Sequence, residues 1–336
     1  MATLYDVARL AAVSPKTVSR VINEPHLVTE ETRERVIDVI KKLDYHPNAI
    51  AASLKRRCSN IVGFVIPYGS DFVFQDPNMM EQLRGAHDLL TTGGYEVIIS
   101  APVYKKDALN EAIRLVKHRS VDGVILYPSA GIEDIIHEFT EKKFSYVTLG
   151  LCFEEQKTNY VDINLTPGAY AATKYLISLG HRHIGLINKP HDFFILGKED
   201  LLCGYQMALQ ESNIEFRPEL ITEGDFTFEG GWRSFEKLKK LNPDLSAVIC
   251  SSDPTTYGVI KGITDAGLKI NRDIEVIAGD NLPLTQKAYP TISSIKNPAY
   301  EQGKQAGKML IDVISSGSKI PGVNLNTEFV VHGKFL

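Results

Sequence analysis

Residues 3–23 read TLYDVARLAAVSPKTVSRVIN and contain two short helical patterns separated by the break AVS. Thr3 is followed three positions later by Asp6, an acidic variant of the capping box that begins a helix. Four apolar residues then recur at i, i+3, i+4 and i+7, the spacing of one helix face: Leu4, Val7, Ala8 and Ala11. The first half of the stretch therefore predicts a short helix with one buried face.

The second half predicts another short helix, and this one displays polar and basic side chains. Ser14 is a good N-cap, and Pro15 occupies the first helical position, where its missing N–H costs nothing. The apolar residues Val18, Val21 and Ile22 share one face. The opposite face then carries Lys16, Thr17, Ser19 and Arg20.

A third amphipathic pattern starts at Thr29, has Glu30 and Glu31 in its first turn, and ends before HPN at residues 46–48. Two short helices joined by a tight turn, with a third helix that closes the core, form a helix-turn-helix unit. In such a unit the N-terminal end of the second helix meets base edges in a major groove. On pattern alone, DNA binding and a plain three-helix bundle with a solvated face are both compatible with these residues.

Composition is that of a globular protein with an uneven charge distribution. The chain has 336 residues, which is long enough for two or three domains, and its net charge is −4. The first sixty residues carry ten basic against seven acidic side chains, and the remainder 27 against 34. No apolar run is long enough to span a membrane, and the N-terminus does not have the pattern of a secretory signal. We therefore expect a cytoplasmic protein.

The sequence does not contain the common signatures of enzymes and metal sites. There is no GxGxxG after a predicted strand, no GxxxxGK[ST], no HExxH and no GxSxG. The four cysteines are scattered and form no CxxC pair, which argues against a zinc site. We predict no catalytic residue, no metal and no cofactor.

From residue 61 onward, short apolar runs alternate with longer amphipathic stretches. The runs predict strands at 61–66, 95–100, 122–127, 146–150, 160–164, 183–188, 247–250, 275–280, 291–295 and 327–333. Helices are predicted at 78–92, 105–118, 166–179, 198–212, 228–240, 254–266 and 299–316. β-rich runs separated by helices indicate parallel sheets with helices on both faces, which is doubly wound α/β architecture.

In this architecture ligands bind beyond the carboxyl ends of the strands. Residues suited to a small ligand follow several predicted strands: Tyr68, Phe72, Phe74, Phe193, Phe226, Ser252, Asp253 and Asp280. Aromatic rings stack on the apolar face of a sugar, and carboxylates accept hydrogen bonds from its hydroxyls. Each residue alone also fits a solvated loop, but their convergence on one strand edge favours a ligand-binding cleft.

The N-terminal stretch resembles the signature TxxDVAxxAGVSxxTVSRVxN of the lactose-repressor (LacI) family of bacterial transcription regulators. The match continues through VTEETRERVIDVIKKLDYHPNAIAASL, so that it covers about 55 residues, and Ala12 stands where most members have glycine. The resemblance implies a sequence-specific DNA-binding regulator, expected to be a repressor that binds a pseudo-palindromic operator in double-stranded DNA as a homodimer. It implies major-groove contacts from Pro15, Lys16 and Arg20, supported by Thr17 and Ser19, and phosphate contacts from Thr3, Tyr5, Ser14, Asn23 and Asn48.

The resemblance also explains the alanine-rich segment NAIAASL, which is too short to be a stable isolated helix. In the family this segment is a hinge that becomes helical on the operator. Two hinge helices would pack through small residues such as Ala51, Leu54 would wedge into a minor-groove step, and Lys55 would reach phosphates.

Over the rest of the chain the resemblance implies two lobes like those of periplasmic sugar-binding proteins. It divides the chain into a helix-turn-helix domain (1–46), a hinge (47–60) and a core (61–336) that binds an effector and dimerises. Crossings between the lobes are expected near 161–164, 290–293 and 320–324. The N-lobe would then hold about 61–161 plus 293–320, and the C-lobe about 162–290 plus 321–336.

Within the expected cleft, Phe226, Asp253 and Asp280 match family positions that contact the effector, and Ser252 replaces the usual asparagine. Leu201 stands where many members place an arginine that clamps the effector. The resemblance implies a small-molecule effector, a carbohydrate or derivative, whose binding changes lobe closure. Two alternatives stay open: control by a protein partner or a non-sugar ligand, and a sugar-binding protein that does not bind an operator.

Overall fold

The computed structural model contains two compact units, Met1–Ser59 and Asn60–Leu336. It describes residues 2–45, 58–66, 68–69, 73–74, 76–101, 114–115, 120–128, 132–150, 156–190, 200–282, 292–331 and 334–335. The expected hinge residues Asn48, Ala51, Leu54 and Lys55 lie outside these described residues, as do Phe72 and Phe193.

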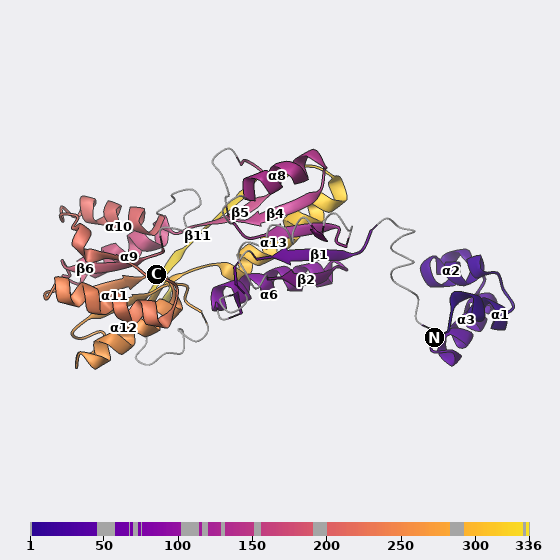
Figure 1. Cartoon of the computed structure of the whole chain (residues 1–336), viewed down its shortest axis with the longest axis horizontal. Helices are drawn as coiled ribbons and strands as arrows, with labels where there is room; N and C mark the ends of the chain where they lie inside the picture. The colour runs from indigo at the N-terminus through magenta and orange to yellow at the C-terminus, as the bar shows by residue number, and fades with distance from the viewer. Residues whose placement is uncertain are drawn as a thin grey trace. The chain divides into compact units, whose positions relative to one another are not determined.

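The first unit is the predicted bundle of three helices. They are α1 (Leu4–Leu10), α2 (Pro15–Asn23) and α3 (Glu30–Lys42), with a short 3-10 turn η1 (Pro25–Leu27) between the last two (Figure 1). The capping box is present, because Asp6 N donates to Thr3 Oγ1 at 3.3 Å and Thr3 N donates to Asp6 Oδ2 at 3.0 Å. Ser14 caps α2 by accepting from Thr17 N at 3.0 Å.

Val7, Val18 and Val36, one from each helix, are fully buried in the core of this unit. Ala12, in the turn between α1 and α2, has a φ of 52°. This left-handed conformation favours glycine and costs a residue with a Cβ roughly 1–2 kcal/mol. The departure from the family signature at this position therefore carries a local backbone strain.

The second unit contains two sheets, and the first of them is entirely parallel. Its strand order is β11-β5-β4-β3-β1-β2. The strands are β1 (Ile61–Val65), β2 (Glu96–Ser100), β3 (Gly123–Leu126), β4 (Ser145–Leu149), β5 (Tyr160–Asn164) and β11 (Val323–Asn326). Figure 1 shows this lobe, with β1 and β2 side by side.

The second sheet has the order β13-β12-β10-β9-β8-β6-β7, and it is parallel except where β12 pairs with β10 and with β13. Its strands are β6 (Ile184–Asn188), β7 (Ile221–Glu223), β8 (Ala247–Cys250), β9 (Glu275–Ala278), β10 (Ser293–Lys296), β12 (Glu328–Val331) and β13 (Lys334–Phe335). The two sheets confirm the predicted α/β architecture with two lobes.

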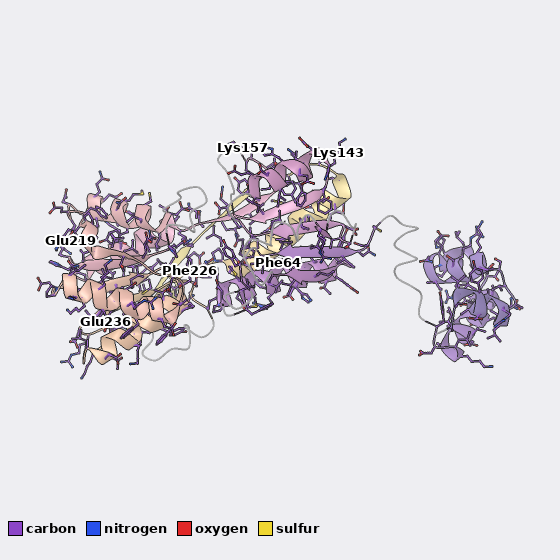
Figure 2. All side chains as sticks on the ribbon, viewed as in Figure 1. Phe64, Lys143, Lys157, Glu219, Phe226 and Glu236 are labelled. Atoms are coloured by element: carbon purple, nitrogen blue, oxygen red, sulfur yellow. The ribbon has the colours of Figure 1, made fainter. Side chains whose placement is uncertain are left out.

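Helices cover both faces of each sheet. On the first sheet α6 (Pro77–Thr92) and α13 (Ala299–Ser316) share one core, which contains Phe64, and α8 (Ile132–Glu141) covers the other face (Figure 2). On the second sheet the pairs are α9 (Thr166–Ser178) with α10 (Asp200–Glu211), and α11 (Phe228–Leu241) with α12 (Asp253–Asp265); the short turn η4 (Pro218–Leu220) precedes β7. No helix in the described part of the chain combines the length and apolar character needed to cross a bilayer.

Three crossings join the two sheets in the described part of the chain. β5 and β11 pair with each other as far as Asn164 and Asn326 within the first sheet, and β10 lies beside β9 in the second. Among the described residues the chain thus changes sheet after Asn164, after Lys296 and after Asn326, where the sequence led us to expect crossings near 161–164, 290–293 and 320–324. Hydrophobic runs locate strands, but they do not reveal which sheet a strand joins.

Thr327 fixes two of these crossings to each other. Its hydroxyl donates to the Asn164 carbonyl at 3.1 Å and accepts from Gly168 N at 3.2 Å. The Asn164 amide also donates to Asn326 Oδ1 at 3.2 Å. The third crossing is anchored at Asn297, whose backbone N–H donates to the Asp280 carbonyl at 3.1 Å.

The pair α6 and α13 packs without room for side chains at its closest point. A Cβ added at Gly303 would lie 1.8 Å from the Gln82 carbonyl oxygen, and one added at Gly85 would lie 2.0 Å from that of Tyr300. Real Cβ atoms do not tolerate such distances, so these glycines allow the two backbones to touch. At Gly307, one turn further along α13, the nearest atom is 3.2 Å away.

We predict that Gly303→Ala lowers the free energy of unfolding by about 1–3 kcal/mol, because the helix pair must separate. Gly307→Ala is the matched control on the same helix. Alanine there gains roughly 0.5–1 kcal/mol of helix propensity against a mild contact, so its stability stays near wild type. Urea denaturation followed by circular dichroism measures both values, and equal stabilities for the two variants would contradict the packing described here.

Candidate functional site

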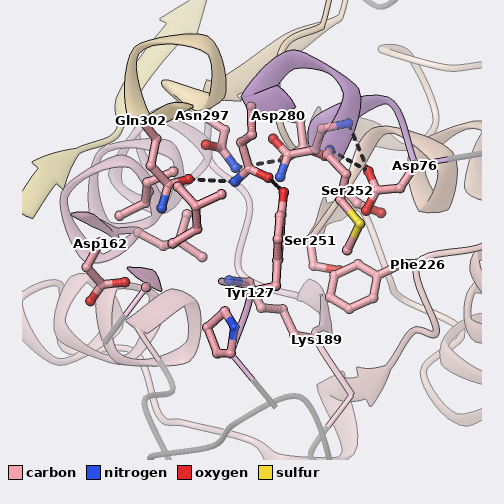
Figure 3. Close-up of a pocket in the computed structure, with 18 of the residues that line it drawn as sticks. Asp76, Tyr127, Asp162, Lys189, Phe226, Ser251, Ser252, Asp280, Asn297 and Gln302 are labelled. Carbon is pink, nitrogen blue, oxygen red and sulfur yellow. Dashed lines mark hydrogen bonds between the residues drawn. The ribbon is translucent and has the colours of Figure 1, made fainter. Parts of the chain in front are cut away.

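The two lobes of the second unit enclose a cavity of about 240 Å³ at the carboxyl ends of their strands (Figure 3). The first lobe contributes Tyr68, Asp76, Gln82, Tyr127 and Asp162, among others. The second contributes Lys189, Asp200, Phe226, Ser251, Ser252 and Asp280. This is the location at which open α/β sheets bind ligands.

Four of the residues singled out in the sequence line this cavity together: Tyr68, Phe226, Ser252 and Asp280. Phe74 does not, since its side chain is 56% exposed and lies outside the lining. Asp253 is 1% exposed, and its carboxylate binds the backbone: Oδ2 accepts a hydrogen bond from Leu282 N at 2.9 Å. Proximity to a strand end in the sequence therefore located the cavity without assigning every side chain correctly.

Phe226, which lines the cavity, has a left-handed backbone conformation. Its φ is 61°, which is rare for a bulky side chain. Two residues further on, α11 begins, capped by Thr227, whose hydroxyl accepts from Gly230 N at 3.0 Å. In Figure 2 Phe226 lies on the side of the second lobe that faces the first. Strained residues of this kind cluster at ligand sites.

A chain of hydrogen bonds stiffens the wall that the first lobe provides. The Tyr127 hydroxyl donates to Gln82 Oε1, Gln82 Nε2 donates to Gln302 Oε1 at 2.5 Å, and Gln302 Nε2 donates to the Val161 carbonyl at 2.8 Å. Burial raises the pKa of Tyr127 well above its usual value, so the phenol keeps its proton. Gln82 and Gln302 were not predicted from the sequence, although each is a polar residue on the buried face of its helix.

Asp76 occupies the N-cap position of α6. One of its oxygens accepts from Asn78 N at 2.8 Å and from Met79 N at 3.3 Å. Burial raises the pKa of this carboxyl, and the two backbone hydrogen bonds act in the opposite direction. The carboxylate thus has partial support from the helix N-terminus, where negative charge is favoured.

Asp280 follows β9 and faces the same cavity from the second lobe. Its Oδ2 accepts from Asp253 N at 3.2 Å, and its Oδ1 accepts from the Asn297 side-chain amide at 3.1 Å. Burial, and then the charge of Asp76, raise the pKa of Asp280 to about 6; its hydrogen bonds and Lys189 oppose the shift. Two carboxylates on opposite lobes therefore repel each other.

Lys189 is the one basic side chain among the described residues that line the cavity. Burial lowers its pKa, and the charges of Asp280, Asp200 and Asp162 oppose that shift. Leu201, which stands where the resemblance expects a clamp arginine, is 3% exposed and packs in the core of the second lobe. No guanidinium reaches the described cavity from that position.

In the described part of the first unit, the residues expected to contact DNA are exposed or half-buried. Lys16 and Arg20 are exposed and stand four positions apart on α2, so they share a face. Tyr5 is 73% exposed, an unusual position for a large aromatic ring. The Asn23 amide donates to the Ser19 carbonyl at 2.8 Å.

A helix-turn-helix unit joined to two α/β lobes around a cavity defines the class of ligand-responsive DNA-binding regulators. Residues 3–48 match the model for bacterial regulatory proteins of the lacI family, and residues 173–333 match that for the periplasmic binding protein-like domain. Catabolite control protein A of Priestia megaterium is 32% identical over 315 residues, covering 92% of this chain and 91% of that protein. The chain therefore belongs to the lacI family and is a DNA-binding transcriptional regulator.

Two further similarities extend over almost the whole chain. The ribose operon repressor of Haemophilus influenzae is 32% identical over 332 residues, covering 97% of this chain and 95% of the repressor. A structure of the transcriptional regulator CelR in complex with cellobiose is 28% identical, covers 98% of this chain and 99% of CelR, and has a TM-score of 0.74. These findings confirm the family and the fold inferred from residues 3–54.

We predict that Asp280 makes the unliganded protein less stable as pH rises. Its folded-state pKa of about 6 exceeds the ordinary value of 3.8. Its stabilising contribution is therefore fully present below about pH 4 and is lost as the pH rises through 6. Between about pH 4.5 and pH 7.5 the wild type should lose on the order of 1–3 kcal/mol relative to Asp280→Asn. Urea titrations at both pH values measure this difference, and an identical gap at each pH would contradict the assignment.

Proposed function

We propose that this protein represses transcription by binding a pseudo-palindromic operator as a homodimer, and that a hydroxyl-rich small molecule in the inter-lobe cavity controls this binding. The supporting observation is the cavity itself, since it joins an aromatic ring, Phe226, to carboxylates from both lobes. That combination suits a carbohydrate or a derivative of one. The likeness to the CelR–cellobiose complex supports the same class of effector. Such a regulator acts in the cytoplasm, where its operator lies.

Operator recognition is assigned to α2 and its surroundings. Lys16 and Arg20 supply the hydrogen bonds to base edges, for which guanine O6 and N7 are the natural acceptors. Pro15 offers only an apolar contact, suited to a thymine methyl group, and Thr17 and Ser19 support the two cations. The phosphate contacts fall to Thr3, Tyr5, Ser14, Asn23, Asn48 and Lys55. Leu54 wedges into a minor-groove step, and Ala51 packs the two hinges of the dimer together.

A surface of the first lobe supports the proposal of a homodimer. Met80, Leu83, Arg84 and His87 of α6 form a groove with Val97 and Ile99 of β2. β2 is an edge strand, and Ile98 and Ile99 are each 40% exposed. Exposed apolar edges of this kind are normally covered by a partner. A second copy of the chain fits best, because a two-fold operator requires a two-fold protein.

Arg20→Ala should weaken binding to the operator by about 1–3 kcal/mol and relax the sequence preference at one base pair. Lys237→Ala, an equal loss of charge at an exposed position of α11, serves as the control and should bind like wild type. Fluorescence anisotropy with DNA from the promoter region of the protein's own gene gives the affinities. If both variants bind that DNA as tightly as wild type does, α2 is not the recognition helix.

Ile99→Glu should convert the dimer into a monomer at micromolar concentration, since it buries a charge at the centre of the proposed interface. Leu241→Glu, at the exposed C-terminal end of α11, is the matched control and should stay dimeric. Sedimentation velocity reports the mass of each variant, and circular dichroism checks that each is folded. A folded Ile99→Glu protein that remains dimeric would place the interface elsewhere.

A further inference from the structure

The cavity contains more negative charge than a neutral sugar requires. Its described lining includes four aspartates, Asp76, Asp162, Asp200 and Asp280, against one basic residue, Lys189. Charges that lie in a partly dry site interact far more strongly than they do in water. A phosphorylated or carboxylated ligand would be repelled here, whereas a cation would be attracted.

The hydrogen bonds at Asp76 and Asp280 come from neutral donors. Asp76 accepts from backbone N–H groups of α6, and Asp280 accepts from the backbone of Asp253 and the amide of Asn297. Such bonds stabilise a carboxylate but do not cancel its charge. The repulsion between the two lobes therefore persists, and Lys189 offsets it only in part.

A second and independent observation concerns buried polar atoms that lack a hydrogen-bond partner among the described residues. Asn297 Oδ1, Asn78 Oδ1 and Ser251 Oγ are buried in the lining of this cavity, and none has a hydrogen-bond partner among the described residues. Buried polar atoms are normally satisfied, and leaving one unpaired is costly. The oxygens of Asn297 and Asn78 can only accept, whereas the Ser251 hydroxyl can accept or donate. A ligand rich in donors would therefore suit this cavity.

From these contacts we infer that the effector is an amino sugar, a hydroxylated ring that carries a protonated amine, and that its ammonium group lies between Asp76 and Asp280. The inference rests on the proposed function, since it specifies the ligand of the same cavity. An ammonium group brings three donors and one positive charge. The ring hydroxyls supply the remaining donors, and Phe226 offers a face for stacking.

Size and electrostatics both agree with such a ligand. The cavity volume of about 240 Å³ lies just below the usual range for drug-sized sites, roughly 300–1,000 Å³, which favours a ligand of monosaccharide size. A cation between Asp76 and Asp280 replaces a repulsion across the cleft with attraction to both lobes. Binding therefore pulls the lobes together, which gives the ligand a means to act on the rest of the protein.

The test uses full-length protein near pH 7 and three matched pairs: glucosamine with glucose, galactosamine with galactose, and mannosamine with mannose. N-acetylglucosamine and glucose 6-phosphate add a neutral amide and an anion. At least one amino sugar should raise the melting temperature and, by calorimetry, bind at least about tenfold tighter than its neutral partner, a difference of about 1.4 kcal/mol. The affinity should fall with added salt and below about pH 6, as Asp280 takes up a proton.

A neutral or phosphorylated sugar that binds more tightly than the amine would overturn the inference and leave the proposed function intact. If none of the compounds binds, the inference fails and so does the assignment of a sugar-class effector, whereas operator binding is judged separately by anisotropy.

Variants at the two carboxylates complete the test. Asp280→Asn and Asp76→Asn should each weaken binding of the amino sugar at least about tenfold. Each should also reduce the ratio between the affinities for the amino sugar and for its neutral partner. Asparagine is a good N-cap, so Asp76→Asn keeps the start of α6. Asp244→Asn, in an exposed turn of the second lobe, is the control and should bind as wild type does. Unchanged selectivity in both folded cavity variants would overturn the inference.

Discussion

The link between Asn297 and Asp280 connects the cavity to the crossings that join the lobes. Asn297 stands in the crossing from β10 to α13, and it donates twice to Asp280, from its backbone to the carbonyl and from its amide to the carboxylate. The other two crossings are held side by side by Thr327. In the proposed mechanism, a ligand that changes the charge at Asp280 acts directly on a segment that joins the lobes. The geometry thus links the cavity and one crossing in a single hydrogen-bonded unit.

The buried carboxylates make sense only in this context. Burying Asp76 and Asp280 across one cleft costs stability, because each raises the free energy of the other's ionised form. A chain selected for stability alone would place apolar side chains there. Departures from such rules cluster at functional sites, where a ligand supplies the missing partner. The wall of Tyr127, Gln82 and Gln302 differs from this, because its polar side chains hydrogen-bond to one another within the first lobe.

Much of the fold could be predicted because its signals are local. Capping at Thr3 and Ser14 and the apolar stripes located the three helices of the first unit, and α13 has the bounds expected from its periodicity. Other elements gave weak signals: β7 has three residues, and β11 alternates with polar side chains (VNLN). The amphipathic segment of α8 did carry a helical pattern and was missed. The sheet to which a strand belongs is decided by tertiary pairing, so hydrophobic runs alone do not fix the crossings between the lobes.

The candidate site was less predictable for the same reason. Position after a strand indicated Tyr68, Phe226, Ser252 and Asp280, but it could not separate them from Phe74, which points to solvent, or from Asp253, which binds backbone. Asp76 and Lys189 become candidate site residues only because each faces charged side chains of the opposite lobe across the cavity. The charge balance within a cavity depends on which distant segments meet there, and a single sequence taken alone does not contain that information.

In the proposed function, occupancy of the cavity controls affinity for the operator. The direct measurement is the dissociation constant of the operator duplex, by fluorescence anisotropy, without ligand and with a saturating amount of the sugar that raises the melting temperature most. We predict a change of about 5–150-fold, matched by an equal change in sugar affinity when operator is bound, since such coupling is reciprocal. An operator affinity that stays the same with the cavity occupied would contradict the account.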